Sequence, residues 1–258
     1  MSDDTVTLAD GGPMPLLGFG TWQMHGREAY DAVRVALEVG YRHIDTATLY
    51  RNEAEIGRAL RDSGVAREDV FVTTKLHPSD VGREGEALRA SLAALGTDHV
   101  DLWLIHWPPR GRSSVPAWRH LVDAHTKGSA RTIGVSNYST AQLDELVDAT
   151  GVTPAVNQIR WSPQLYDRRV VEQLHARGVV LEGYSPFRAS DLRDPVLADV
   201  ASAHDVSAAQ VVLRWHIDHG FVVIPKSARR ERIVANFDVF GFSLTAAELA
   251  RIDALGRP

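Results

Sequence analysis

The feature that most constrains this chain is a short β-branched or apolar run followed by a helical segment, which recurs eight times. Short strands that alternate with helices predict a parallel sheet. Eight such units in 258 residues favour a closed (β/α)₈ TIM barrel, formed as one domain over residues 1–258. The runs are Leu16–Gly20, Tyr41–Asp45, Val70–Lys75, Val100–His106, Arg131–Ser136, Ala155–Ile159, Val179–Tyr184 and Phe221–Pro225.

Helix boundaries support the same alternation. Ser207 and Gln210 have the spacing of a capping box, which predicts a helix that begins there and stops at Gly220. Extra helices are expected towards the C-terminus, before and after the last strand. The further helical segments are Glu28–Val39, Glu53–Asp62, Asp194–His204 and Thr245–Leu255.

A doubly wound open sheet is the competing architecture. It predicts a G-x-G-x-x-G motif after the first strand. Here Gly18 and Gly20 are present, but Gln23 stands where the third glycine is needed. The barrel is therefore favoured.

Composition excludes several classes of function. The net charge of −5 gives no footprint for nucleic acid. The chain has no cysteine, which excludes disulfides, thiolate nucleophiles and cysteine-bound zinc. The N-terminus is acidic and polar, unlike a signal peptide, and no apolar run approaches the roughly 18 residues of a membrane span. A cytoplasmic protein that does not bind membranes is expected.

Polar side chains stand where the predicted strands end, which is where (β/α)₈ barrels place their chemistry. Asp45, Lys75 and His106 close the second, third and fourth runs. Because Asp45 and Lys75 close neighbouring strands, their charged groups are expected to meet at the barrel mouth. On these two residues alone a structural ion pair remains open, since desolvation offsets much of the Coulomb energy of such a pair.

Tyr50 lies in the predicted loop after Asp45. A free phenol has a pKa of about 10, and a nearby ammonium lowers it. With Lys75 in reach, Tyr50 is expected to act as a general acid in carbonyl reduction, and His106 to hydrogen-bond the substrate oxygen. Alone, Tyr50 is compatible with a loop aromatic and His106 with a core histidine. The four residues together indicate catalysis.

A basic segment follows the last strand, where the loops of such barrels often bind phosphate. Its cationic side chains, the Ser227 hydroxyl and the free N–H groups of a helix N-terminus predict an anion site for phosphate. A solvated basic helix end is the alternative, in particular for Arg230. The cations are Lys226, Arg229, Arg230 and Arg232.

Together these motifs resemble those of the aldo-keto reductases over nearly the whole chain. PKSARRERIVANFDVF at 225–240 is most similar to the bacterial branch that includes the diketogluconate reductases. The resemblance implies a (β/α)₈ barrel with an N-terminal hairpin and extra C-terminal helices. It also implies a monomeric enzyme that reduces aldehydes or ketones to alcohols with NADPH. The matching motifs are GFGTW at 18–22, YRHIDTATLYRNEAEIG at 41–57, TTKL at 73–76, HWP at 106–108, IGVSNY at 133–138, NQI at 157–159, YSP at 184–186 and IPKS at 224–227.

The resemblance also implies roles for single residues. Tyr50 would be the proton donor, assisted by Lys75 and Asp45, while His106 orients the carbonyl. Trp22 and Trp107 would line the substrate pocket with Tyr50 and His106, although ordinary barrel packing remains open for both tryptophans. No metal is implied.

The residues implied to contact the cofactor fall into groups. Some would hold the nicotinamide carboxamide, one would stack on its ring, and others would line the cofactor tunnel or grip the 2′-phosphate and adenine. In chain order they are Gly20, Thr21, Asp45, Ser136, Asn137, Gln158, Tyr184, Ser185, Phe187, Lys226, Ser227, Arg229, Arg232 and Asn236.

The chain also departs from the family pattern. Arg160 and Trp161 follow NQI where an acid is common, Ala235 replaces another acid, and Phe187-Arg188 follows YSP. The segment at 109–118 and the end at 256–258 are short, so a more open pocket is expected. The substrate itself cannot be identified from the sequence.

Two other functions remain open. His43 and Asp45 resemble part of a metal-dependent hydrolase site, but the later strands end without the His or Asp ligands such a site needs. A barrel that binds NADPH as a regulatory subunit without turnover is the second, because a fold alone does not guarantee chemistry.

Overall fold

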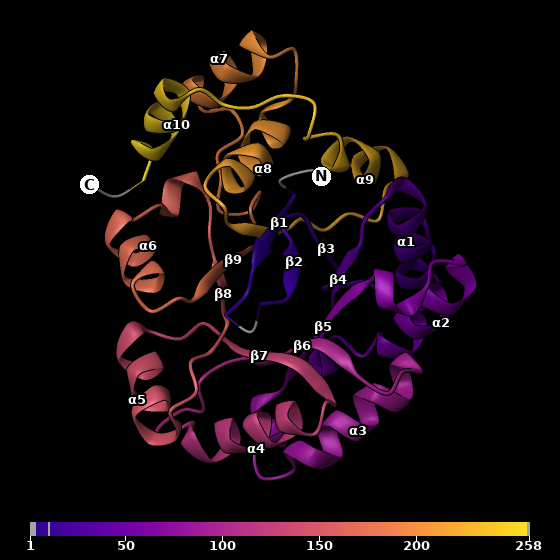
Figure 1. Ribbon diagram of the computed structural model, residues 1–258. Coiled ribbons are helices and arrows are strands. Elements are labelled where there is room, and N and C mark those ends of the chain that lie inside the picture. Colours follow the sequence, from indigo (N-terminus) through magenta and orange to yellow (C-terminus); the bar gives the residue numbers. More distant parts are fainter. Residues whose placement is uncertain (1–3, 10, 257–258) are drawn as a thin grey trace.

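The computed structural model describes residues 4–9 and 11–256, and its centre is a ring of parallel strands surrounded by helices (Figure 1). In this described part of the chain, eight strands form one sheet in the order β10-β9-β8-β7-β6-β5-β4-β3. The strands are β3 (Phe19–Gly20), β4 (His43–Asp45), β5 (Phe71–Leu76), β6 (Val100–Ile105), β7 (Ala130–Ser136), β8 (Val156–Arg160), β9 (Val180–Tyr184) and β10 (Val222–Ile224).

The two edges of this sheet meet and close the ring. Leu17 forms a parallel bridge with Val223. The Gly18 amide donates to the Val223 carbonyl at 2.9 Å, and the Val223 amide donates to the Leu16 carbonyl at 2.8 Å. The predicted (β/α)₈ barrel is therefore confirmed. The predicted first strand, Leu16–Gly20, is observed only at Phe19–Gly20, because Leu16–Gly18 pair with β10 through this single bridge.

The predicted N-terminal hairpin is also confirmed. Strands β1 (Thr5–Thr7) and β2 (Pro13–Pro15) pair antiparallel with Val6 opposite Met14. The hairpin crosses the centre of the ring in Figure 1 and leads directly into β3. It therefore lies at the N-terminal ends of the barrel strands, and their C-terminal ends open on the other side.

The helical segments whose bounds were predicted begin and end close to the expected residues. Gly40, after the first helix, has φ of 126°, which favours glycine. Ser207 and Gln210 form the expected capping box. The helices are α1 (Gly26–Val39), α2 (Glu53–Ser63), α3 (Glu84–Leu95), α4 (Val115–Thr126), α5 (Thr140–Thr150), α6 (Arg168–His175), α7 (Pro195–Ala203), α8 (Ala208–Asp218), α9 (Arg230–Phe237) and α10 (Ala246–Asp253).

Helices α7 and α10 are the extra C-terminal helices, and they lie side by side outside the ring in Figure 1. Among the described residues no single helix is long and apolar enough to cross a bilayer, although α7 and α8, bent by 86°, pass that test as a pair.

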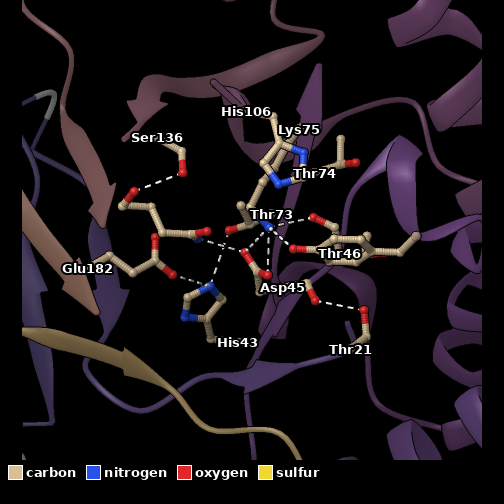
Figure 2. A network of polar contacts seen from close by, with 12 residues as sticks. Thr21, His43, Asp45, Thr46, Thr73, Thr74, Lys75, His106, Ser136 and Glu182 are labelled. Atoms are coloured by element: carbon tan, nitrogen blue, oxygen red, sulfur yellow. Dashed lines mark hydrogen bonds and ion pairs between the residues drawn. The ribbon is translucent and has the colours of Figure 1, made fainter. Parts of the chain in front are cut away.

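The barrel interior is unusually polar. Side chains alternate across a strand, so His43 and Asp45 face the interior while Ile44 faces the helices. Barrel interiors are normally filled by bulky apolar residues. Here the buried interior also contains Thr73, Lys75 and Glu182 (Figure 2), together with Gln158, which contacts Asp45. Such a polar interior needs internal partners, and these partners define the candidate site.

Candidate active site

Asp45 and Lys75 form a buried ion pair where β4 and β5 end. The Lys75 Nζ lies 2.6 and 2.7 Å from the two carboxylate oxygens of Asp45 and donates to the Thr46 carbonyl at 2.8 Å. Figure 2 shows this pair at the centre of a network of polar side chains. Burial alone would lower the pKa of Lys75, but the charges of Asp45 and Tyr50 outweigh burial and raise it. Lys75 is therefore a fixed cation, and the predicted pairing is confirmed.

Tyr50 lies within reach of this cation, as predicted. It ends the short 3₁₀ turn η1 (Thr48–Tyr50), and the Lys75 Nζ lies 3.4 Å from the Tyr50 hydroxyl. The Thr48 hydroxyl donates to the Lys75 carbonyl at 3.0 Å, which fixes the turn against β5. The phenol and the ammonium are thus held together by side-chain and backbone contacts.

Asn52 anchors the same turn from its other end. Its fully buried side chain accepts a hydrogen bond from Thr46 at 2.7 Å and donates to the carbonyls of Thr21 and Met24 at 3.0 Å each. The amide therefore joins the loop after β4 to the loop after β3. Nothing in the sequence analysis identified this residue.

Two opposing effects act on the Tyr50 phenol. Burial raises its pKa and the Lys75 ammonium lowers it, and together they set the pKa at about 12. The expected lowering by Lys75 is present. The net pKa nevertheless lies above the ordinary value of 10 rather than below it, because desolvation of the phenolate is the larger effect. The phenol is protonated at neutral pH, which is the state that a proton donor requires.

His106 follows β6 and faces the same cavity. Its ring packs edge-on against Tyr50, with centroids 5.7 Å apart, and stacks on Trp107 at 3.8 Å. Burial lowers the pKa of His106 to about 2, and the charge of Lys75 adds to this effect. The imidazole is therefore neutral, with one N–H available as a donor to an oxygen in the cavity.

Ser136, Asn137 and Tyr184 come together at the ends of β7 and β9. Asn137 donates to the Ser136 hydroxyl at 2.9 Å and accepts from the Tyr184 hydroxyl at 2.8 Å. Asn137 has φ of 65°, a left-handed conformation that is uncommon outside glycine. The three residues form one hydrogen-bonded group beside His106, whose carbonyl also accepts from Asn137 at 3.2 Å.

Gln158 has an additional partner that the sequence did not indicate. Its Nε2 donates to Asp45 Oδ2 at 2.8 Å. Its backbone carbonyl accepts from the Ser136 hydroxyl at 2.8 Å. Gln158 therefore connects the Ser136–Asn137–Tyr184 group to the Asp45–Lys75 pair.

The basic segment after β10 separates into two kinds of arginine. Arg230 forms a bidentate ion pair with Glu38 of α1, with contacts of 2.6 and 3.0 Å. Arg232, by contrast, is exposed and has no acidic partner among the described residues. The buried Ser227 hydroxyl accepts from the Arg229 amide at 3.1 Å, where α9 begins. Arg232 remains available for an anion, whereas Arg230 is a surface ion pair.

The cavity at the barrel mouth has a volume of about 450 Å³. Trp22 and Trp107 line it and are 40% and 37% exposed, so ordinary barrel packing does not explain them. Arg188 also lines it, with its guanidinium 5.0 Å from the centre of the Trp22 ring. Arg160 finds no acidic partner in the described chain and donates instead to the Arg188 carbonyl at 3.4 Å.

The residues implied for a nicotinamide cofactor divide by their position. Asn236 is buried on α9, Thr21 donates to the Asp45 carbonyl, and Phe187 packs against the hydrophobic core rather than the cavity. The cavity and the basic segment of β10 and α9 meet at Lys226, which belongs to both. The residues implied for the cofactor that do line the cavity are Gly20, Asp45, Ser136, Asn137, Gln158, Tyr184, Ser185 and Lys226.

The chemistry of these groups fits such a cofactor. Amide and hydroxyl groups beside an aromatic ring suit a carboxamide-bearing ring, and unpaired cations suit phosphate.

Glu182 is the second residue that the sequence analysis missed. It is fully buried in β9, and neither carboxyl oxygen has a hydrogen-bond partner among the described residues. The only signal in the sequence is an acid inside an apolar run, two residues before Tyr184.

The residues that a metal-dependent hydrolase would need are not brought together. Within residues 4–9 and 11–256, no group of three or more His, Cys, Asp or Glu side chains is arranged to hold a metal ion. His43 Nε2 instead lies 3.1 Å from the Thr73 hydroxyl.

Comparison with known proteins gives a consistent result. The family model described as "Aldo/keto reductase family" matches residues 16–257. Morphine 6-dehydrogenase of Pseudomonas putida is 43% identical over 268 residues, covering 97% of this chain and 90% of that protein. The crystal structure of an aldo/keto reductase from Brucella melitensis has a TM-score of 0.95 and 44% identity, covering 99% of this chain and 98% of the other. A Bombyx mori aldo-keto reductase in complex with NADP has a TM-score of 0.91 and 35% identity, covering 98% and 92%.

Proposed function

This chain belongs to the aldo/keto reductase family, and from that premise we propose that it reduces an aldehyde or ketone to an alcohol with NADPH, using Tyr50 as the proton donor. One observation carries the proposal. The Tyr50 hydroxyl lies 3.4 Å from a lysine that is itself paired with Asp45, in a cavity that His106 also lines. A lone structural ion pair would not need a phenol and a neutral imidazole beside it.

NADPH, when bound, supplies the hydride that reduces the carbonyl carbon. The protein contributes position and a proton. Ser136, Asn137 and Gln158 would hold the nicotinamide carboxamide, with Tyr184 against the ring. Lys226, Ser227 and Arg232 would hold the 2′-phosphate at the start of α9, with Arg229 beside them. Because this phosphate is the group that NADH lacks, the unpaired Arg232 supports a preference for NADPH.

His106 would donate its N–H to the substrate carbonyl oxygen and so fix its orientation. Negative charge grows on that oxygen as the carbon is reduced, and donors aimed at it stabilise the transition state. Tyr50 then transfers its proton to the oxygen. An alkoxide is a stronger base than a phenolate, so a phenol with a pKa of about 12 can still protonate it. Lys75 stabilises the phenolate that is left behind.

The direct test is a panel of aldehydes, ketones and diketo acids, with NADPH oxidation followed by absorbance. The proposal expects NADPH-dependent reduction of some members and slower reaction with NADH. A barrel that only binds NADPH would instead show quenching of NADPH fluorescence but no oxidation with any carbonyl compound. Diketo acids in the panel also test the resemblance to the diketogluconate reductase branch.

The proposal includes a cytoplasmic monomer. Light scattering of the purified protein at several concentrations measures the oligomeric state, and a stable dimer would contradict that part.

A further inference from the structure

Glu182 occupies a position where a carboxyl group is costly. It lies in the middle of β9, in register with Gln158 on β8 and Val222 on β10. Its side chain is fully buried, and Figure 2 shows it beside His43 in the barrel interior. The distance from His43 Nε2 to Glu182 Oε1 is 3.8 Å, which is too long for a hydrogen bond.

Among the described residues, no cation donates a hydrogen bond to Glu182. The titratable and charged groups that face it are His43 and Asp45 from β4 and Lys75 from β5. Burial lowers the pKa of His43 to about 3, so that ring is neutral. Lys75 is already held by both oxygens of Asp45. A buried carboxylate with no counter-charge and no donor would be strongly unfavourable, so Glu182 keeps its proton.

The same conclusion follows from the electrostatics. Burial raises the pKa of Glu182 most and the negative charge of Asp45 raises it further, and together these effects exceed the lowering by the nearby Gln158 amide and by the charge of Lys75. When two acids share one interior, only one of them ionises readily. Lys75 and Gln158 bind Asp45 directly, whereas neither donates a hydrogen bond to Glu182 in the described chain.

The protonation of Glu182 matters to Gln158. The Gln158 amide donates to Asp45 at 2.8 Å. An ionised Glu182 would be an acceptor only and would compete for that amide from the adjacent strand. A protonated Glu182 is a weaker competitor, because its carbonyl oxygen carries no full negative charge and its O–H is itself a donor. The amide therefore stays on Asp45, which in turn holds Lys75 beside Tyr50.

We propose that Glu182 is a positioning residue for the reduction: it remains a neutral acid, keeps the Gln158 amide on Asp45, and leaves Lys75 facing a single carboxylate. This inference rests on the proposed function. When Glu182 ionises at alkaline pH, a second negative charge enters the interior and competes for Gln158. That charge makes the Tyr50 phenolate less favourable, so proton donation slows.

The first test compares the wild type with Glu182→Gln, which is neutral at every pH. The turnover number kcat is measured with NADPH and a reactive aldehyde from neutral to alkaline pH. We expect Glu182→Gln to retain kcat at neutral pH to within about twofold, far less than the loss of at least about 100-fold when a general acid is removed. We also expect kcat of the wild type to fall at alkaline pH and kcat of Glu182→Gln not to fall, with KM little changed in both.

Glu84→Gln is the matched control. Glu84 is also buried, at 2% exposure, but its carboxylate binds the Gly82 amide at the start of α3, outside the site. This variant should keep the fall in kcat at alkaline pH. A fall in kcat of Glu182→Gln equal to that of the wild type would overturn the proposal. So would a loss of kcat of more than about tenfold at neutral pH, because it would mean that the site needs the carboxylate.

A second measurement does not depend on turnover. Infrared difference spectra between the wild type and Glu182→Gln, recorded at neutral pH, should contain the C=O stretching band of a protonated carboxylic acid. Carboxylate bands in its place would overturn the inference even if the enzyme is active. Failure of the whole carbonyl panel would instead refute the proposed function and leave the band unaffected.

Discussion

Lys75 connects the groups on which the proposed chemistry depends. Its ammonium binds both oxygens of Asp45 and lies 3.4 Å from the Tyr50 hydroxyl. Burying two charges costs several kcal/mol per ion, and close contact with further hydrogen bonds offsets that cost. Asp45 receives such a bond from Gln158 and Lys75 donates one to Thr46. The pair is therefore one unit whose members cannot be removed separately without penalty.

The first prediction concerns this unit. Lys75→Met should lower the free energy of unfolding by about 3–5 kcal/mol, because Asp45 is left buried without its counter-charge. It should also abolish most of the reduction. The double variant Asp45→Asn, Lys75→Met removes both charges and should recover much of the stability but none of the activity. Urea unfolding and turnover measured on the same preparations separate the two effects. A single variant as stable as the wild type would contradict this account.

The side chains proposed for catalysis could be located from the sequence because of their positions relative to the strands. Asp45, Lys75 and His106 lie at or next to the ends of strands, and barrel chemistry occurs at strand ends. Glu182 was not predictable, because a sequence does not show that its carboxyl group points inward without a partner. The net pKa of Tyr50 could not be predicted from the sequence either, because it depends on how far the effect of burial exceeds the effect of Lys75.

The segment from β10 to α9 supplies the second prediction. Arg232→Ala should weaken NADPH binding by roughly 10- to 100-fold, the worth of a charge-assisted hydrogen bond, while NADH binding changes little. Arg230→Ala is the matched control, because Arg230 is already paired with Glu38. It removes the same charge type from the same helix and should leave both affinities nearly unchanged. Fluorescence titration with each cofactor measures them, and equal losses for NADPH and NADH in Arg232→Ala would place the phosphate elsewhere.

The close approach of β3 to β10 supplies the third prediction. A Cβ added at Gly18 would lie 2.5 Å from His43 Nδ1 and 2.8 Å from a methyl group of Ile224. Gly18→Ala should therefore destabilise the barrel by about 1–3 kcal/mol, as overpacking usually does. Gly85→Ala, in the exposed first turn of α3, meets only an arginine nitrogen at 3.5 Å and should stabilise by about 0.5–1 kcal/mol. Chemical denaturation measures the change in the free energy of unfolding for each variant. Changes of the same sign in the two variants would contradict this prediction.

The strands and helices were largely predictable from local signals. Each of the eight predicted strands is present in the described chain, because β-branched runs and helix caps mark them. The predicted starts of β3 and β4 are too early in the sequence, because residues 16–18 and 41–42 precede the regularly paired strands. The position of Phe187 was also not predictable: it packs on the core because of how the loop after β9 folds, which local sequence does not determine.

The barrel as a whole should be sensitive to acid, which is the fourth prediction. Burial lowers the pKa of His43 to about 3, of His106 to about 2 and of His216 to about 4, from an ordinary 6.5. The unfolded chain therefore binds more protons than the folded chain below pH 6.5, so stability falls as the pH falls. Each histidine should cost about 2 kcal/mol at pH 5 relative to neutral pH. Urea unfolding at several pH values measures the effect. A urea midpoint at pH 5 equal to that at pH 7 would contradict this prediction.

A single-turnover reduction by Tyr50→Phe, with NADPH affinity measured on the same protein, shows whether the Tyr50 hydroxyl donates the proton. Phenylalanine keeps the ring and removes only the hydroxyl that faces Lys75. We expect a rate at least about 100-fold below that of the wild type, the usual contribution of a general acid, with NADPH affinity essentially unchanged. A Tyr50→Phe protein that retains most of the wild-type rate would contradict it.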